Sequence, residues 1–434
     1  MANEWPIKTI AECSSANPYS TQIGPFGKAL MADEYVESGV PVLRGVNVNR
    51  GRFHDDDFVF IDSETADSLY KFESFPGDVL LVHKGTLGKI GLMPTKRKYP
   101  RYIMGNSMMR VRCDPAKLLP EYLYYWLTSA DGQHYLFSRV SQVGVPQIQM
   151  PLTTLRQAEL HVPSLPEQRA ITRILGTLDD KIELNRRMNE TLEAIARTLF
   201  KSWFVDFDPV RARAEGRAPA GMDADTAALF PDSFEETELG MVPKGWRIGT
   251  VGKDYYLTMG QSPPGETYNE EMDGVPFYQG RTDFGNRYPS VRMYCNAPTR
   301  MANSGDTLIS VRAPVGDINM ASERCCIGRG LSAIRHKAGS RSFTYYMMCS
   351  LKEIFAQFEA EGTVFGSINK NDFKEIRCIS PQEVIIKKFE DKMSPLDQMI
   401  ENNEIESQTL CAIRDALLPK LLWNEVEIPV FLHV

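Results

Sequence analysis

The chain has 434 residues, of which 43% are hydrophobic and 24% charged, and its formal net charge is −7. Such a chain forms several globular domains, about three by length alone, and it has no run of about 18 apolar residues that could span a membrane. The N-terminus lacks the basic-then-apolar layout of a signal peptide, so we expect a cytoplasmic protein. The eight cysteines are scattered without a Cys-x-x-Cys motif, which predicts free thiols and no metal site.

The first expected element is a short amphipathic segment led by Trp5, followed by a glycine-bounded apolar segment at Gly39–Gly45. At Gly77–Val82, a Gly-Asp turn leads into an apolar run typical of a buried strand. Aromatic and leucine residues at helical spacing predict a helix between residues 118 and 137. Residues 1–155 are therefore predicted to form a mixed α/β globule.

A long helix is predicted within residues 156–215. After a proline-bounded segment, Val162–Glu167, apolar and asparagine residues recur at alternating steps of four and three, the pattern of a coiled-coil seam. The seam consists of Ile171, Leu175, Leu178, Ile182, Asn185, Asn189, Leu192, Ala196 and Leu199. Residues 216–242 contain six acidic residues and one basic residue, and we expect them to form an acidic linker.

The segment 243–380 repeats the first globule at a period of roughly 220 to 240 residues. A Trp-led start, a glycine-bounded apolar segment, a Gly-Asp strand and a closing glycine recur in the same order. These matching features begin at Trp246, Gly274, Gly305 and Gly316. A helix is again predicted after them, between residues 342 and 358.

A second long helix is predicted within residues 381–434. Its seam consists of Phe389, Met393, Leu396, Ile400, Asn403, Ser407, Leu410, Arg414, Leu417 and Leu421. Asn185 and Asn403 occupy the same slot of the two seams, and a buried polar pair fixes register, so we expect the helices to pair. An antiparallel pair would relate the two halves by a two-fold axis. The alternative is that each helix caps its own globule and the asparagines face water.

Basic residues are concentrated at comparable places in the two halves. Residues 83–117 contain nine Lys and Arg against one acidic residue, and residues 281–341 contain ten against four. In contrast, residues 381–434 contain ten acidic and five basic residues. Because nucleic-acid binding depends on local charge, the two basic stretches indicate DNA-facing loops. The alternative is that they are ordinary solvated faces.

Motifs of catalysis are missing from the sequence. Asn17–Tyr19 lacks the second proline of an amino-methyltransferase loop, and His54–Asp57 is more typical of an exposed acidic turn than of a cation site. The six histidines do not cluster around a candidate general base. We therefore expect a non-catalytic chain that binds no metal.

Together these features predict an α/β (α+β) fold with an internal pseudo-two-fold repeat. Two globular domains would be separated by two long antiparallel coiled-coil helices. The five predicted segments are 1–155, 156–215, 216–242, 243–380 and 381–434.

Three segments resemble the central conserved region of the specificity subunits of Type I restriction-modification systems: Val162–Arg169, Leu178–Ile182 and Thr198–Phe207. The Gly-Asp strands and the Trp-led starts look like the target recognition domains of that family, so the resemblance covers essentially the whole chain. The C-terminal copy departs from the pattern, with Ser380–Glu383 in place of the fuller proline motif.

The resemblance implies a DNA-binding specificity subunit in which target recognition domains 1–155 and 243–380 each read half of a bipartite double-stranded target. The helical regions 156–215 and 381–434 would set the spacer between the half-sites and dock two modification (methyltransferase) subunits. Restriction (endonuclease and translocase) subunits would complete the complex. S-adenosylmethionine, ATP and magnesium would be bound by those partners, and no cofactor by this chain.

Residues near the repeated segments are the candidates for DNA contact. The candidate base-reading residues are Arg44, Asn47, Lys84, Gln279, Arg281 and Arg312. The candidate phosphate-contacting residues, clustered as point charges, are Lys89, Lys96, Arg97, Lys98 and Arg101. Two other functions stay open from the residues alone: a stand-alone DNA-binding regulator that self-associates through its helices, and a methyltransferase with a disguised active site.

Overall fold

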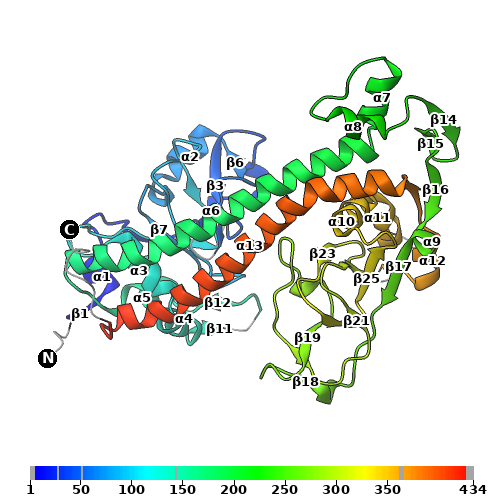
Figure 1. Cartoon of the computed structure of the whole chain (residues 1–434). Coiled ribbons are helices and arrows are strands. Elements are labelled where there is room, and N and C mark those ends of the chain that lie inside the picture. The colour runs from blue at the N-terminus through cyan, green and yellow to red at the C-terminus, as the bar shows by residue number, and fades with distance from the viewer. Residues whose placement is uncertain (1–4, 27–28, 50–51, 142–143, 361–365, 427–434) are drawn as a thin grey trace. The chain divides into compact units, whose positions relative to one another are not determined.

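The computed structural model describes residues 5–26, 29–49, 52–141, 144–360 and 366–426 (Figure 1). The chain divides into two compact units. Unit 1 consists of residues 1–184 and 405–434, and unit 2 consists of residues 185–404.

Unit 1 is built on two main sheets. Its strands are β1 (Ile7–Thr9), β2 (Thr21–Ile23), β3 (Val40–Leu43), β4 (Val48–Asn49), β5 (Arg52–Phe53), β6 (Val59–Ile61), β7 (Val79–Val82), β8 (Ile90–Leu92), β9 (Ile103–Met104), β10 (Met108–Val111), β11 (Val140–Ser141), β12 (Gln147–Ile148) and β13 (Glu159–His161). One sheet is antiparallel with the order β2-β10-β7-β8, and the other has the order β6-β3-β9 with β3 and β9 parallel. The short helices are α1 (Ile10–Cys13), α2 (Ser63–Ser68), α3 (Pro120–Thr128), α4 (Ala130–Phe137) and α5 (Pro151–Arg156).

Unit 2 repeats this plan. Its strands are β14 (Phe234–Thr237), β15 (Gly240–Pro243), β16 (Arg247–Thr250), β17 (Tyr255–Met259), β18 (Tyr268–Asn269), β19 (Val275–Tyr278), β20 (Tyr294–Cys295), β21 (Met301–Ala302), β22 (Thr307–Ser310), β23 (Ile318–Met320), β24 (Cys325–Ile327), β25 (Leu331–His336) and β26 (Arg377–Ser380). The sheet β17-β25-β22-β23 matches β2-β10-β7-β8, and the parallel pair β19 and β24 matches β3 and β9. The short helices are α7 (Asp208–Ala214), α8 (Ala224–Ala228), α9 (Val251–Asp254), α10 (Arg341–Ser350), α11 (Lys352–Ala360) and α12 (Lys370–Glu375).

The repeat extends to single contacts and confirms the predicted fold class. Gly77 and Gly305 both have φ of +82°, a conformation open to glycine, and each begins the turn into a fully buried central strand, β7 or β22. The aspartate that follows each glycine forms an ion pair across the sheet. Asp78 pairs with Arg112 and Asp306 with Arg335, at 2.8 and 2.7 Å between side-chain N and O.

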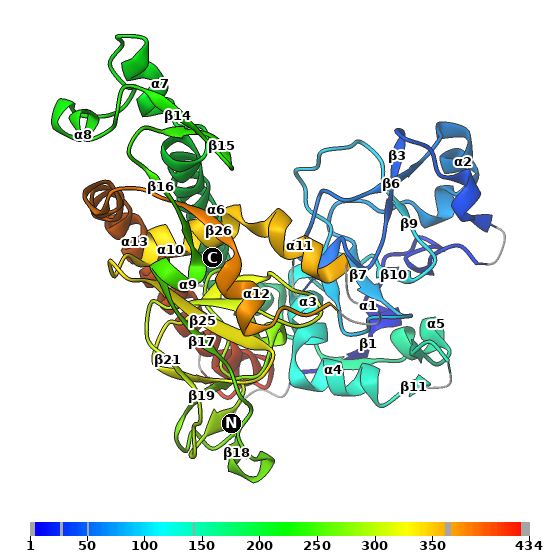
Figure 2. The ribbon, with the colours of Figure 1, turned by 90° about the vertical axis from the view of Figure 1, so that its right-hand side faces the viewer.

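Each predicted helix of the globules is in fact two helices. In unit 1 the chain is extended at Ser129, whose hydroxyl accepts the Gly132 N–H at 3.2 Å and so begins α4. In unit 2, Leu351 separates α10 from α11. Helical periodicity alone could not show these breaks, because the apolar spacing continues through them. In unit 2, α9 and α12 contact each other next to β16 and β26 (Figure 2).

The two long helices are α6 (Leu165–Phe204) and α13 (Glu383–Leu422), and they pair antiparallel as predicted. In unit 1, Asp179 of α6 accepts from Arg414 of α13 at 2.8 Å. In unit 2, Asn403 Nδ2 donates to Asn189 Oδ1 at 2.8 Å, and Asn185 Nδ2 donates to the Asn403 carbonyl at 3.4 Å. Both asparagine side chains of α6 are buried at this level.

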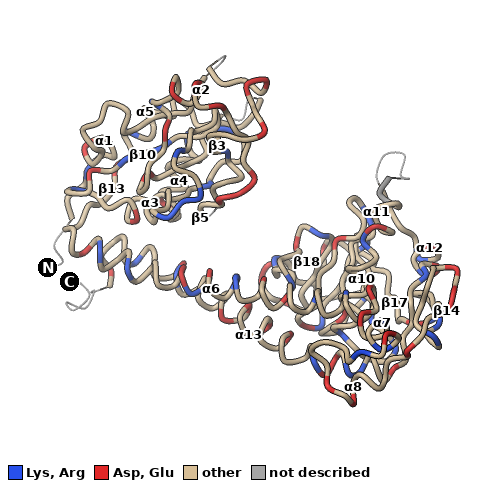
Figure 3. Tube along the Cα trace, turned by 90° about the horizontal axis from the view of Figure 1, so that it is seen from above, with Lys and Arg blue, Asp and Glu red and all other residues tan. Residues whose placement is uncertain are grey.

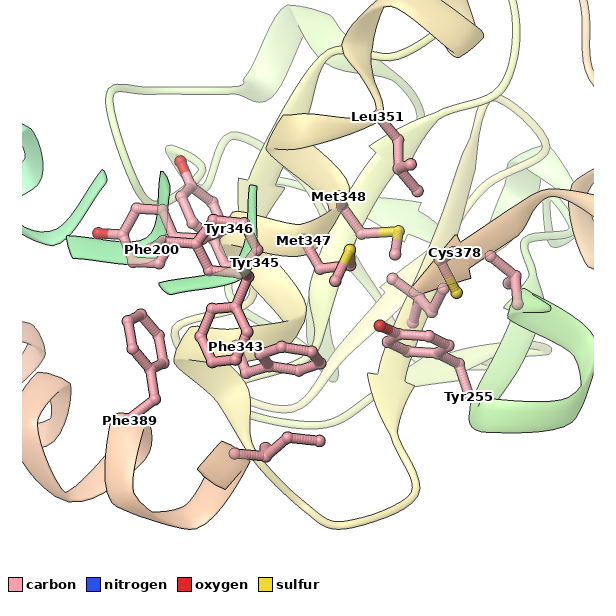
Figure 4. Packing of buried hydrophobic residues seen from close by; sticks show 14 of the residues in the cluster. Phe200, Tyr255, Phe343, Tyr345, Tyr346, Met347, Met348, Leu351, Cys378 and Phe389 are labelled. Atoms are coloured by element: carbon pink, nitrogen blue, oxygen red, sulfur yellow. The ribbon is translucent and has the colours of Figure 1, made fainter. Parts of the chain in front are cut away.

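The long helices also pack against the globules, but each contributes to both cores instead of capping one globule, and Asn185 and Asn189 do not face water. Ile171 and Leu175 near the start of α6 belong to the core of unit 1, together with Leu418 and Leu421 near the end of α13. The opposite ends of the same helices contribute to the core of unit 2, with Leu192 from α6 and Ile400 from α13. Seen from close by, Phe200 of α6 and Phe389 of α13 pack against Phe343 and Tyr346 of α10 (Figure 4).

The compact units therefore differ from the five predicted segments. Each unit combines one globule with part of α6 and part of α13. The stretch 216–242, expected to be a linker, contains α8 and part of the β14–β15 hairpin, and Phe230 and Val242 are buried in the core of unit 2. Its acidic residues lie on the surface of a folded segment, because Asp225, Glu235 and Glu236 are exposed.

Candidate DNA interface

In unit 2, four loops meet at one edge of the two sheets. We call this the loop edge of unit 2, and its residues are 260–262, 279–281, 311–317 and 328–330. Backbone hydrogen bonds join the loops: Gly328 N–H donates to the Tyr278 carbonyl at 2.8 Å, and Val311 N–H donates to the Gly330 carbonyl at 2.9 Å. Gly260 N–H donates to the Leu331 carbonyl at 2.9 Å. The edge is therefore a single bonded framework.

The loop edge of unit 2 brings together its three candidate base-reading residues. Gln279, Arg281 and Arg312 are all exposed on it. Arg281 Nη1 lies 2.5 Å from a carboxylate oxygen of Asp317, so part of its charge is neutralised. Arg312 forms no ion pair within the residues that the structure describes, and its backbone bridges to Ser367. Their role in contacting bases stays a prediction.

Unit 1 has the equivalent loop edge, formed by residues 24–26, 44–47, 83–89 and 105–107. The same three backbone bonds recur: Gly105 N–H to the Leu43 carbonyl at 2.8 Å, His83 N–H to the Ser107 carbonyl at 2.9 Å, and Gly24 N–H to the Met108 carbonyl at 2.8 Å. By these bonds, Arg44 corresponds to Gln279 and Lys84 to Arg312.

Two candidate residues of unit 1 lie on the loop edge, and one is inside the protein. Lys84 is exposed, and Arg44 is partly exposed and donates to the Asp57 carbonyl at 2.7 Å. Asn47 is fully buried: its Oδ1 accepts the Arg44 N–H at 2.8 Å and its Nδ2 donates to the Asp56 carbonyl at 2.8 Å. Its amide stabilises the loop and has no group left to present to a base, so we do not keep it as a base reader.

The phosphate candidates also divide into exposed and engaged residues. Lys96 and Lys98 are exposed, and Lys98 Nζ lies 5.5 Å from the centre of the Tyr99 ring; Arg97 is half-buried over the Tyr102 ring. Lys89 donates to the Gly45 carbonyl at 3.1 Å, which places it at the loop edge. Arg101 bonds to Asp67 at 2.7 Å and to Glu73 at 3.0 Å, so it stabilises unit 1 and we no longer favour it for phosphate contact.

The two basic stretches overstate the positive charge available to a polyanion. Acidic residues lie on the same globules as the lysines and arginines (Figure 3). Arg110 is buried, and its guanidinium donates to the carbonyls of Tyr19, Lys71 and Glu73; this burial lowers its pKa to about 10. Arg112 and Arg335 form the cross-sheet pairs with aspartates. The free charge is therefore concentrated on a few loop residues.

A family model described as the Type I restriction modification DNA specificity domain matches residues 23–194. A putative Type I restriction enzyme MjaX specificity subunit of Methanocaldococcus jannaschii is 28% identical over 396 residues, covering 90% of this chain and 88% of the relative. The chain belongs to the Type I specificity subunits. The HindI specificity subunit of Haemophilus influenzae is 28% identical over 374 residues, covering 75% of this chain and 81% of the relative.

The fold agrees with this assignment. The crystal structure of the Type I restriction-modification system S subunit from M. genitalium matches with a TM-score of 0.57 at 17% identity, and the match covers 96% of each chain. As a specificity subunit, the chain is a non-catalytic component of a restriction-modification system and not a methyltransferase. Among the described residues, no group of three or more His, Cys, Asp or Glu side chains could hold a metal ion. None of the helices in the described ranges is long and apolar enough to cross a membrane.

Sequence reasoning missed one buried residue of this specificity subunit, Arg287. Within unit 2, its guanidinium donates to Glu193 of α6 at 2.8 Å and to Asp397 of α13 at 2.7 Å, and its Cζ lies 3.7 Å from the centre of the Tyr345 ring. It therefore joins the loop between β19 and β20 to both long helices. Nothing in the local sequence distinguishes it, because its partners are 94 and 110 residues away along the chain.

Proposed function

We propose that residues 1–155 and 243–380 each read one half of a bipartite double-stranded DNA target through their loop edges. The observation that supports this proposal is the repeated framework: three backbone bonds recur in both units, while the exposed side chains on them differ. An unchanged framework with changed side chains is what two similar domains need to read different half-sites in the major groove.

The helical regions 156–215 and 381–434 are proposed to dock two modification subunits, and restriction subunits would join that complex in the cytoplasm. Apolar side chains exposed on the long helices support a protein-binding role, since each is 43% to 57% exposed. They are Leu184, Ile195, Met399, Ile405 and Ile413. In this assembly, S-adenosylmethionine, ATP and magnesium would be bound by the partner subunits.

The proposal is tested by expressing the full chain with a modification subunit in a host free of other methylation and mapping the methylated sites. We expect one bipartite motif, two short half-sites separated by a fixed spacer. A continuous motif, or methylation without sequence preference, would exclude two-domain reading. Specific DNA binding by the chain alone, with no assembly with the modification subunit, would favour the stand-alone regulator.

The exposed lysines between β8 and β9 give a prediction about salt dependence. Replacing Lys96 and Lys98 with alanine should weaken binding of the complex to all DNA sequences alike. It should also make the negative slope of log K against log salt shallower by about 2, because each phosphate contact contributes about 0.9 to its magnitude. Affinity is measured on target and non-target duplexes between about 50 and 200 mM salt. Over this range, proteins with several phosphate contacts typically lose at least about 10³-fold in affinity. Lys244→Ala, which removes an exposed lysine of the β14–β15 segment, should leave the slope unchanged. A change of the target motif in the double variant would contradict the phosphate assignment.

The paired helices are proposed to set the spacer between the half-sites. Since α6 and α13 pair antiparallel with Asn185 opposite Asn403, a lengthened variant needs insertions in both helices. Four residues inserted after Asn185 and four after Asn403 add about 6 Å, and we expect the spacer to grow by one or two base pairs with both half-sites unchanged. Methylation mapping reads this directly, and altered half-site letters at an unchanged spacer would disprove the role of the helices.

A further inference from the structure

The turn that precedes β10 in unit 1 and the turn that precedes β25 in unit 2 are clamped in the same way by neighbouring loops. These turns are Gly105–Ser107 before β10 and Gly328–Gly330 before β25. A Cβ on Gly105 would lie 2.8 Å from the Leu43 carbonyl oxygen, and one on Gly328 would lie 2.9 Å from the Gln279 Cα. Only glycine allows this close approach of the turn to the loop after β3 or β19.

A second glycine closes the other side of each turn. A Cβ on Gly24 would lie 1.9 Å from the Gly105 carbonyl oxygen, and one on Gly260 would lie 2.1 Å from that of Gly328. Each turn is thus held between two neighbouring loops, and glycines at equivalent positions allow this close packing in both units. The main-chain path at its middle residue is therefore fixed by packing on both sides.

The middle residues of these turns, Asn106 and Arg329, are the equivalent positions. The Asn106 carbonyl accepts a hydrogen bond from His83 Nε2 at 3.1 Å, and burial lowers the pKa of His83, so its ring is neutral at pH 7. Arg329 N–H donates to Ser262 Oγ at 3.2 Å. Both residues are exposed, and within the described ranges neither side chain forms a hydrogen bond or an ion pair. Each position therefore combines an anchored backbone with an unused side chain.

These side chains are next to the candidate base readers and have the chemistry to read bases. Bonds of the framework connect the turns to the loops of Lys84 and Arg312. A guanidinium pairs bidentately with O6 and N7 of guanine, and a carboxamide pairs with N6 and N7 of adenine in the major groove. Asn106 also presents the exposed amide that buried Asn47 cannot.

We propose that Asn106 and Arg329 are base-reading residues, with Asn106 contacting adenine in the half-site of residues 1–155 and Arg329 contacting guanine in that of residues 243–380. This inference rests on the proposed reading of a bipartite target. Because the two turns are equivalent, the side chain of one turn can replace that of the other without disturbing the backbone hydrogen bonds of the loop edge.

The test is methylation mapping of the full chain, expressed with its modification subunit, for Arg329→Asn and for Asn106→Arg. Each substitution should change the preferred base pair at one position of one half-site, with about a 10- to 100-fold loss of preference for the original base, and leave the other half-site and the spacer unchanged. Arg329→Gln provides a second, independent variant at the same position. The melting temperatures of the purified variants should match that of the wild type, because neither side chain forms a hydrogen bond or an ion pair with the residues that the structure describes.

The matched control is Arg324→Asn. Arg324 is also exposed but precedes β24, at the end of that strand away from the loop edge, and its replacement should leave the motif unchanged. An unchanged motif in all Arg329 variants would overturn the inference, and so would a uniform loss of methylation at every base, since that result indicates a phosphate contact. If the wild type itself yields no bipartite motif, the proposed function fails, and this is seen before any variant is compared.

Discussion

Exchanging the first recognition domain for that of another specificity subunit is expected to change one half-site of the target and to leave the other half-site unchanged. The reason is that each loop edge is bonded within its own unit, so the exposed side chains of one edge are held independently of the other. Methylation mapping of the hybrid, expressed with the original modification subunit, measures both half-sites at once. We expect methylation of the original target to be lost and a hybrid target to replace it.

The structure shows where the exchanged segment should end. A junction at residue 155 would fall within α5 and would separate β1 from its partner β13. We therefore place it after Val162, so that both strands come from the donor. The donor must keep the contacts of α6 with the globule, among them Gln168, which is buried and accepts the Leu119 N–H at 2.8 Å. The unexchanged chain, expressed with the same modification subunit, is the control, and a change in both half-sites of the hybrid would exclude independent reading.

Replacing Arg287 with alanine is expected to destabilise unit 2 strongly. The residue is 1% exposed, and its removal leaves Glu193 and Asp397 without the cation that pairs with both. Breaking a buried ion pair by removing one partner typically costs about 3–5 kcal/mol. In a unit of this size, that corresponds to a decrease in melting temperature of about 10 °C.

The measurement is thermal unfolding of the purified chain, with Arg217→Ala as the control. Arg217 pairs with Glu215 on the surface, where both side chains are more than half exposed, so its loss should cost at most about 1 kcal/mol. Equal melting temperatures for the two variants would show that the Arg287 cluster contributes no stability. For Arg287→Ala at elevated temperature, we expect methylation to decrease while the half-sites stay the same. The reason is that Arg287 stabilises unit 2 and is not a candidate for base contact.

The repeat and the long helices could be predicted from the sequence because they depend on local patterns. The Gly-Asp turns at Gly77 and Gly305 mark the central strands, and a seam with Asn185 and Asn403 in one slot indicates paired helices. The division of each helix between two cores could not be predicted. Periodicity shows which face of a helix is apolar, but the element that covers that face is chosen by the tertiary fold.

Side-chain roles on the loop edges were the least predictable feature. Asn47 and Asn106 are similar loop asparagines in the sequence, and only the folded turn shows that the first is buried and the second exposed. Arg101 follows three basic residues closely, but its ion pairs are made with Asp67 and Glu73, far back along the chain. A cluster of positive charge in sequence thus separates into structural and available residues only when distant partners are known.

The structure of the full chain with its modification subunit bound to target DNA, determined by electron cryo-microscopy, tests the central claim most directly. We expect residues 44, 84 and 106 in the major groove of one half-site and residues 279, 312 and 329 in that of the other. Contacts of the bases with any other surface of this chain, while both loop edges face solvent, would contradict the account.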